Sequence, residues 1–126
     1  MDEHPNAAWF REMSAKVDAG DFQAMMDALA DDVVWHEIGS DQPLRGKEAV
    51  VKRWTSGDLA DVQFTGTTHD IVANHQHTIA LVETTVTRNG GSLTYRTAEI
   101  MHVRDGKIAE RWAFSDDTGR INEFFA

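Results

Sequence analysis

The chain has 126 residues, 41% of them hydrophobic, which is typical of one globular domain and excludes a disordered protein. Its 21 acidic and 12 basic residues give a net charge of −9, which would repel nucleic-acid phosphates and anionic membranes. It has no cysteine, so disulfides and thiolate chemistry are excluded, and the first residues lack a secretion signal. We expect a single cytoplasmic domain over residues 1–126 that binds neither nucleic acid nor membrane.

Helical periodicity dominates the first half of the chain. Residues 6–19 carry apolar side chains at helical spacing, and a second helix is expected from Asp21. A strand should follow within residues 30–39, ADDVVWHEIG, and a loop with glycine and proline within residues 39–46. KEAVVKRWTSG, residues 47–57, is expected to form a third helix.

The second half of the chain alternates polar residues with β-branched and aromatic ones, the pattern of strands. Asn89-Gly90-Gly91 and Asp105-Gly106 have the composition of hairpin turns. The last residues, 118–126, are expected to be a tail with an apolar end. The predicted strands are residues 62–76, 77–89, 91–104 and 107–115. This order predicts an α+β fold in which helices cover one face of a mostly antiparallel sheet.

Both faces of the predicted sheet carry large or apolar residues. Ile100 and His102 fall on one face, and Met101 and Val103 on the other. A sheet that is apolar on both sides needs two covers, and the helices supply one of them. We expect a second copy of the chain to supply the other, as a homodimer through the outer sheet face.

The order of these elements, with characteristic stretches at 19–21, 30–40, 46–50 and 105–117, resembles the NTF2-like superfamily. The stretches are AGD, ADDVVWHEIGS, GKEAV and DGKIAERWAFSDD. Within the superfamily the chain is most similar to SnoaL-like proteins and ketosteroid isomerases. The resemblance implies a cone-shaped barrel, with three N-terminal helices packed on a curved sheet around a pocket. It leaves the reaction open, because isomerases, cyclases, dehydratases, epoxide hydrolases and non-enzymatic binders share this scaffold.

Glu37 is the sharpest catalytic candidate. By resemblance it occupies the place of the ketosteroid isomerase base, and it should share a strand face with Trp35. Trp54 falls where an aromatic residue backs the isomerase pocket. The two oxyanion donors of that enzyme would fall near Met13 and Ile100, which cannot donate hydrogen bonds. The alternative for Glu37 is a strand-end glutamate in water or paired with an arginine.

Three further residues are candidates for the chemistry. Asp116, followed at once by Asp117, fits the acid/base aspartate that SnoaL-like cyclases carry a few residues after a tryptophan. His102 would bind a substrate oxygen or exchange a proton with Glu37, unless it is a core or interface histidine. Arg111 would clamp an anion or keep Glu37 ionised, unless it is solvated.

Two other chemistries are not expected. Limonene-epoxide-hydrolase relatives need two aspartates joined by an arginine, whereas Arg96 and Glu99 fall on opposite faces of their strand. His75 and His77 have the spacing of metal ligands but should lie in a turn, with no third ligand nearby, so we expect no metal. The residues expected to wall an apolar pocket and bind substrate are Phe10, Met13, Trp35, Trp54, Phe64, Ile100 and Arg111.

Two functions from different classes follow from these residues. The first is an enzyme that uses acid/base catalysis, without metal or organic cofactor, on a small apolar carbonyl compound of polyketide, steroid or terpenoid kind. Its reaction would be an isomerisation, cyclisation or dehydration. The second is a non-catalytic binder of an apolar metabolite, or a dimeric scaffold. An open cavity shared by Glu37 and His102 would favour the enzyme, and a cavity filled by Trp54, Met13 and Phe64 the scaffold.

Overall fold

The structure is a computed structural model that describes residues 3–56 and 61–126. Its helices are α1 (Pro5–Asp18), α2 (Phe22–Asp27), α3 (Lys47–Thr55) and α4 (Thr118–Phe125). Its strands are β1 (Leu29–Trp35), β2 (Leu44–Arg45), β3 (Gln63–Ala73), β4 (His77–Arg88), β5 (Gly91–Arg104) and β6 (Lys107–Ser115). None of the described helices has the length and apolar character needed to cross a membrane.

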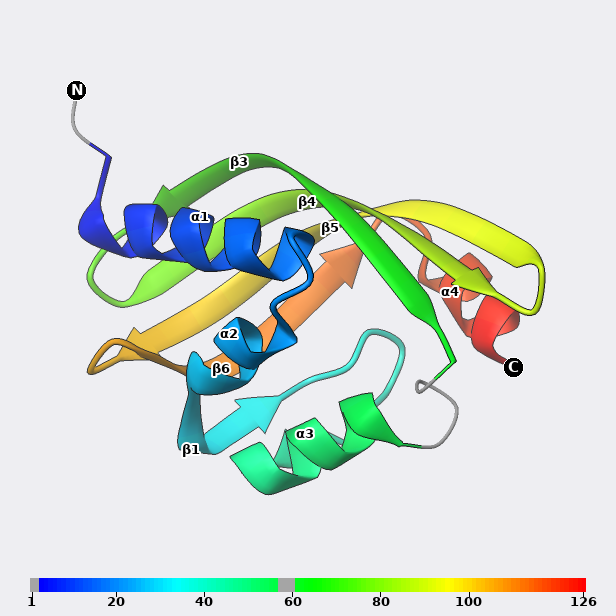
Figure 1. Cartoon of the computed structure of the whole chain (residues 1–126), viewed down its shortest axis with the longest axis horizontal. Helices are drawn as coiled ribbons and strands as arrows, with labels where there is room; N and C mark the ends of the chain where they lie inside the picture. The colour runs from blue at the N-terminus through cyan, green and yellow to red at the C-terminus, as the bar shows by residue number, and fades with distance from the viewer. Residues whose placement is uncertain (1–2, 57–60) are drawn as a thin grey trace.

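The described strands form one curved sheet in the order β2-β1-β6-β5-β4-β3, shown in Figure 1. Neighbouring strands are antiparallel except β1 and β6, which run parallel. The helices α1, α2 and α3 cover one face, here called the inner face, and α4 lies beyond them beside the β4–β5 hairpin. The predicted α+β, cone-like fold is confirmed, but the sheet does not close, and β2 and β3 are its two edges.

Local sequence signals explain where the first helices begin. Pro5 occupies the first turn of α1, and the Nδ1 atom of His4 accepts a hydrogen bond from the backbone N–H of Asn6 at 3.1 Å. The cap of α1 is therefore His4, which directly precedes the proline. Asp21 caps α2, because its Oδ1 atom accepts a hydrogen bond from the N–H of Ala24 at 3.2 Å.

The two predicted hairpin turns are present. Asn89 and Gly90 have φ values of 52° and 81°, and Asp105 and Gly106 have φ values of 52° and 73°. Left-handed backbone at two consecutive positions is the requirement of a two-residue turn whose twist matches the strands on either side. These turns fix the long antiparallel pairings of β4 with β5 and of β5 with β6.

The prediction of a tail over residues 118–126 is wrong, because these residues form α4. The Oδ1 atom of Asp117 accepts a hydrogen bond from the N–H of Arg120 and so caps the helix. Ile121 is 5% exposed, and the phenylalanines three and four residues later pack near it. Apolar residues at this spacing indicate a helix. The segment has only eight residues, about two helical turns, so the pattern is too short to identify the helix from the sequence.

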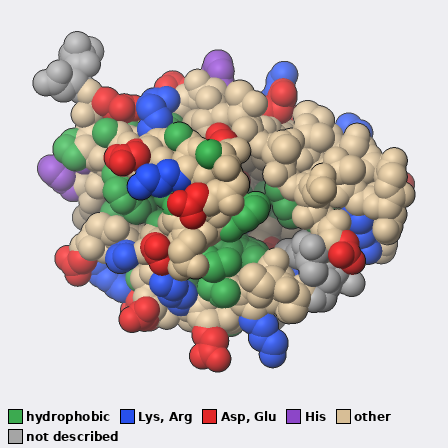
Figure 2. Space-filling view, in the orientation of Figure 1, with side chains coloured by type: hydrophobic (Ala, Val, Ile, Leu, Met, Phe, Trp, Pro, Cys, Tyr) green, Lys and Arg blue, Asp and Glu red, His purple; other side chains and the backbone are tan. Residues whose placement is uncertain are grey.

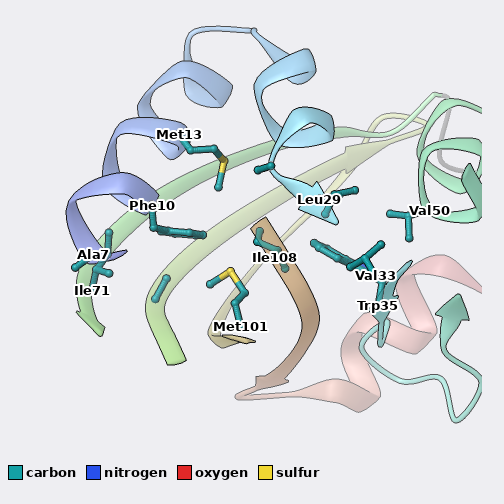
Figure 3. Packing of buried hydrophobic residues seen from close by; sticks show 12 residues of the cluster. Ala7, Phe10, Met13, Leu29, Val33, Trp35, Val50, Ile71, Met101 and Ile108 are labelled. Carbon is teal, nitrogen blue, oxygen red and sulfur yellow. The ribbon is translucent and has the colours of Figure 1, made fainter. Parts of the chain in front are cut away.

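Two hydrophobic clusters fill the inner face of the sheet. The first, seen in Figure 3, has as buried members Ala7, Phe10, Met13, Ala28, Leu29, Val33, Trp35, Val50, Ile71, Ala80, Met101 and Ile108. The second lies against α4, and its buried members are Val86, Leu93, Tyr95 and Ile121. The inner-face residues between the clusters include charged and hydroxyl side chains, which makes this region the candidate site.

Shortening Leu29 should show how far the fold depends on the first cluster. Leu29 is 1% exposed, so Leu29→Ala should lower the free energy of unfolding by about 2–5 kcal/mol through lost burial and a residual cavity. Urea denaturation at one protein concentration measures the loss. Phe22→Ala, at a side chain that is 60% exposed on α2, is the control and should cost less than about 1 kcal/mol. Equal losses in the two variants would contradict this assignment of the core.

Candidate functional site

The side chains of β5 alternate between the two faces of the sheet. Met101 belongs to the first hydrophobic cluster and therefore marks the inner face. Glu99, Thr97 and Tyr95 share that face, at intervals of two residues. Ile100 lies between Glu99 and Met101 in sequence and points to the outer face. Three polar side chains of one strand thus line the region between the hydrophobic clusters.

Arg111 is the most connected polar side chain of the inner face. It lies opposite Met101 on β6, and its Nε and Nη2 atoms both donate to Oε1 of Glu99, at 3.0 and 2.6 Å. Its Nη1 atom donates to the backbone oxygen of His36 at 2.8 Å. The guanidinium lies 4.4 Å from the ring centroid of Trp35, a cation–π contact. Only 11% of the Arg111 side chain and 20% of the Glu99 side chain are exposed.

Glu37 follows β1 and is held by α3. The Nε atom of Arg53 donates to both of its carboxylate oxygens, at 3.2 and 3.3 Å, and 27% of the glutamate side chain is exposed. The next residue of α3, Trp54, packs edge-on against Trp35, with 5.0 Å between ring centroids. Arg111 faces inward, as one interpretation of the sequence proposed, but the partner of Glu37 is Arg53.

Tyr95 and Thr97 complete the polar band with hydroxyl groups. They are 9% and 6% exposed, and within the described part of the chain the Oγ1 atom of Thr97 is buried without a hydrogen-bond partner. Burial raises the pKa of the Tyr95 phenol, the charge of Glu99 raises it further, and Arg111 opposes this rise. The phenol therefore lies within reach of the electric field of the Glu99–Arg111 pair.

A hollow on the helix side and a groove along β6 lie near this region. Figure 2 shows hydrophobic side chains gathered around a hollow near the centre of the face that carries α1, α2 and α3. A groove of about 520 Å³ runs along the end of β6, where β1 has already ended. Its lining residues are His36, Glu37, Ile38, Gly39, Ser40, Glu110, Trp112, Ala113, Phe114, Ser115 and Thr118. Glu110, Trp112 and Phe114 point to the outer face, so the groove lies mainly on that side, and Glu37 borders it with 27% of its side chain exposed.

Comparison with known proteins agrees with this architecture. Residues 10–111 match the SnoaL-like domain family. The chain belongs to this family. No curated protein sequence matches the chain at a significant level. Membership of the family agrees with the fold of this SnoaL-like domain, in which helices and a curved sheet enclose the inner face.

Solved structures show the same fold in proteins of low sequence identity. Bal32a, from a soil-derived mobile gene cassette, is 18% identical with a TM-score of 0.81, and 96% of each chain is covered. An LEH-like epoxide hydrolase of M. tuberculosis is 19% identical with a TM-score of 0.73, covering 92% of this chain and 86% of the other. IdmH of Streptomyces antibioticus, provisionally described as a polyketide cyclase, is 21% identical with a TM-score of 0.71, covering 98% and 100%. At these identities the likeness concerns the fold alone.

His102 and Ile100 lie on the outer face of the SnoaL-like domain, away from the polar band. The Nε2 atoms of His102 and His77 are 2.7 Å apart, and the Nδ1 atom of His102 is 3.6 Å from a carboxylate oxygen of Glu110. Trp112 packs edge-on against the ring of His102, with centroids 5.1 Å apart. His102 and Glu37 are therefore not brought together in the interior. The sequence comparison placed Ile100 at the position of an inward-facing oxyanion donor, but the inward residue there is its neighbour Glu99, a carboxylate. A shift of one residue along a strand moves every side chain to the other face and explains this difference.

Asp116 and Asp117, directly after β6, accept hydrogen bonds from backbone amides of β5 and α4. The Oδ1 atom of Asp116 accepts from the N–H of Arg96 at 3.1 Å, and Asp117 caps α4. Both aspartates are exposed. Neither side chain is directed into the polar band, so these contacts give both residues a role in holding strand and helix ends.

The remaining sequence candidates are divided between core and surface. Phe10 and Met13 are buried in the first cluster, with 6% and 5% exposure. Phe64 is 46% exposed and stacks on Phe125, with 6.5 Å between centroids. Among the residues that the structure describes, no three side chains converge as metal ligands, and His77 instead contacts His102.

Two functional candidates were missed from the sequence, Glu99 and Arg53. Glu99 was considered only with Arg96, and the structure confirms that these two side chains lie on opposite faces. Its inward position follows from the alternation with Met101, once Met101 is known to be core. Arg53 lies beside Trp54 on α3, and no sequence pattern connects it with Glu37, which precedes it by 16 residues.

The raised pKa of Tyr95 predicts how stability changes at alkaline pH. The folded protein keeps the phenol proton to higher pH than the unfolded chain, whose tyrosine titrates near ~10. The free energy of unfolding is therefore unaffected by this group below that pH, falls above it, and levels off above the folded pKa. Tyr95→Phe should remove this part of the alkaline loss, measured by urea denaturation across pH.

The chain has one tyrosine, so the ultraviolet absorbance of phenolate reports Tyr95 alone. Titration of the native protein and of the protein in urea gives the two midpoints directly. A native midpoint at or below the midpoint in urea would contradict the buried position of the phenol.

Proposed function

We propose that this SnoaL-like domain is a cytoplasmic small-molecule enzyme that uses acid/base catalysis in its interior. Its substrate would be an apolar carbonyl compound of polyketide, steroid or terpenoid kind, and its reaction an isomerisation, cyclisation or dehydration. The observation that carries the proposal is the pair of arginine–carboxylate contacts, Glu99–Arg111 and Glu37–Arg53, in a region flanked by hydrophobic clusters. Few, oriented polar groups among apolar walls are typical of small-molecule sites.

Glu37 is the proposed base. Its contacts with Arg53 are longer than the shortest contact of Glu99 with Arg111, and its side chain borders the groove at the end of β6. A ligand can therefore approach it without first displacing a buried ion pair. In the proposed step the carboxylate takes a proton from a carbon next to the carbonyl, and the electron pair moves to the carbonyl oxygen as an enolate. Return of the proton to another carbon completes an isomerisation.

The enolate oxygen needs hydrogen-bond donors, and Met13 and Ile100 supply none. Arg111 has five N–H donors, three of which are engaged by Glu99 and His36. Its remaining N–H groups and the Tyr95 hydroxyl are the proposed donors on the inner face. The outer position of His102 and the backbone contact of Asp116 leave both residues out of this mechanism.

A non-catalytic binder is the second candidate, and a specific observation favours it. Both inward carboxylates are paired with arginines, whose hydrogen bonds occupy carboxylate oxygens and hold the side chains in place. Met13 is part of the first cluster and Trp54 packs against it, so part of the expected pocket wall is filled. The binder and the enzyme use the same interior and differ in whether Glu37 transfers a proton.

Replacing Glu37 separates the two candidates. Glu37→Gln keeps the size of the side chain and removes the base, so turnover should fall at least ~100-fold on any carbonyl substrate found by screening unsaturated ketones. Binding of the same compound should persist. Glu12→Gln, at an exposed position of α1, is the matched control and should leave turnover unchanged. Full turnover by Glu37→Gln would exclude Glu37 as the base.

We also propose a homodimer through the outer face of the sheet. Val72, Leu81 and Phe114 project from this face with 55%, 41% and 63% exposure, and Trp112 lies half-buried beside Phe114. Exposed apolar side chains that gather on one sheet face favour a protein partner, and a second copy presents the same surface.

A charge placed on the outer face should prevent this association. Leu81→Glu would bury two carboxylates in a symmetric interface, so the variant should sediment as a monomer at concentrations where the parent protein is a dimer. Phe22→Glu, at a 60% exposed phenylalanine on α2, is the control and should remain dimeric. A parent protein that is monomeric throughout would contradict the dimer.

A further inference from the structure

Three inner-face residues of β5, here called the β5 stripe, carry oxygen atoms without a partner. They are Tyr95, Thr97 and Glu99. Within the described residues, Oγ1 of Thr97 is buried and has no hydrogen-bond partner. The Tyr95 hydroxyl and Oε2 of Glu99 also form no hydrogen bond with the described protein groups, since Arg111 contacts only Oε1 of Glu99. Of these three atoms, Oγ1 of Thr97 is the buried one, and a buried polar atom left unpaired costs free energy, so a partner from another molecule is favoured at this position.

The charge of the stripe decides what that molecule is. Arg111 places both of its contacts with Glu99 on Oε1, which leaves Oε2 free while the pair as a whole is neutral. A carboxylate oxygen accepts hydrogen bonds and cannot donate them. A ligand must therefore donate at Oε2, as a hydroxyl does, and a carboxylate or phosphate placed there would be repelled.

The strand neighbours of Glu99 are apolar, whereas Thr97 and Tyr95 each have one hydroxyl neighbour, Ser115 and Thr84. In the register of β4 with β5, Val82 lies opposite Thr97 and Ala80 lies opposite Glu99. On the other side, Ala113 of β6 lies opposite Glu99. Beside Glu99 the body of the ligand therefore meets hydrocarbon, and hydroxyl groups gather around Thr97 and Tyr95. Thr97 and Glu99 are two residues apart, a separation of about 7 Å along a strand.

We propose that the interior binds a neutral, largely apolar molecule with two oxygen substituents about 7 Å apart. One is a hydroxyl that donates to Oε2 of Glu99. The other, a hydroxyl or a carbonyl, is bound by the hydroxyl groups of Thr97 and Tyr95. The inference rests on the proposed use of the interior as the ligand site, and it defines the class of compound that the site accepts.

The test compares three probes of the same aromatic body by titration calorimetry. 2,6-Dihydroxynaphthalene offers two hydroxyl groups at a comparable separation, 2,6-dimethoxynaphthalene removes the donors, and naphthalene-2,6-dicarboxylate adds charge. We expect the diol to bind, the dimethyl ether to bind at least about tenfold more weakly, and the dicarboxylate not to bind. Equal binding by the ether or the dicarboxylate, or no binding by the diol, would overturn the proposal.

Two matched variants locate the binding. Thr97→Val removes a hydroxyl that is unpaired in the free protein, so it should keep or raise stability while weakening the diol about threefold to tenfold. Thr78→Val removes another buried, unpaired hydroxyl, on β4 opposite Met101 and outside the stripe. It should affect stability similarly and leave diol affinity unchanged. Unchanged affinity in Thr97→Val, or equal weakening in both, would also overturn the proposal.

This binding experiment is independent of turnover. Glu37→Gln should bind the diol normally, because Glu37 is not part of the stripe. If the diol follows the expected pattern and no substrate is turned over, the ligand class stands and the enzyme falls. If Glu37→Gln abolishes turnover and the probes show no preference, the enzyme stands and the ligand class falls.

Discussion

The pairing of Arg111 inside the molecule is the constraint on which the site depends. A guanidinium that is 11% exposed must be compensated by nearby acceptors, because an unpaired buried cation is costly. Here the acceptors come from β5, through Glu99, and from the chain just after β1, through the backbone oxygen of His36. One side chain of β6 therefore joins the neighbouring strand β5 to the chain after β1, which lies 75 residues earlier. It also sets the course of the chain that leads to Glu37.

This arrangement divides the inner face into parts with different physical roles. The clusters on either side bury hydrocarbon and supply most of the stability. The band between them contains ion pairs and unpaired hydroxyls, which contribute little to stability and are costly when left incomplete. Polar groups kept at such a position are better explained by a ligand than by folding.

The same fold supports proteins with different functions, and the reason lies in the strands. Each strand of the curved sheet presents alternate residues to the interior, so a few substitutions replace the polar groups without disturbing the pairing of strands. In this SnoaL-like domain the inward positions of β5 are Tyr95, Thr97, Glu99 and Met101. The outward positions carry His102 and Ile100, whose neighbours on β4 and β6 extend a second, separate surface. The proposed activity and the proposed association thus depend on alternate residues of one strand.

Sequence alone determined the order of the first three helices and of the five longer strands, both hairpin turns and the family, because these depend on local periodicity and on residues that accept left-handed backbone. It also identified Glu37 beside Trp35 as a candidate. The tertiary structure decided which face of β5 is interior. Periodicity separates Glu99 from Ile100 but does not say which of them is covered, since both faces carry apolar residues. It also decided the arginine partners, because Arg53 and Arg111 find Glu37 and Glu99 only when α3 and β6 are packed against their neighbours. Such contacts depend on the spatial arrangement of segments, which local sequence patterns do not encode.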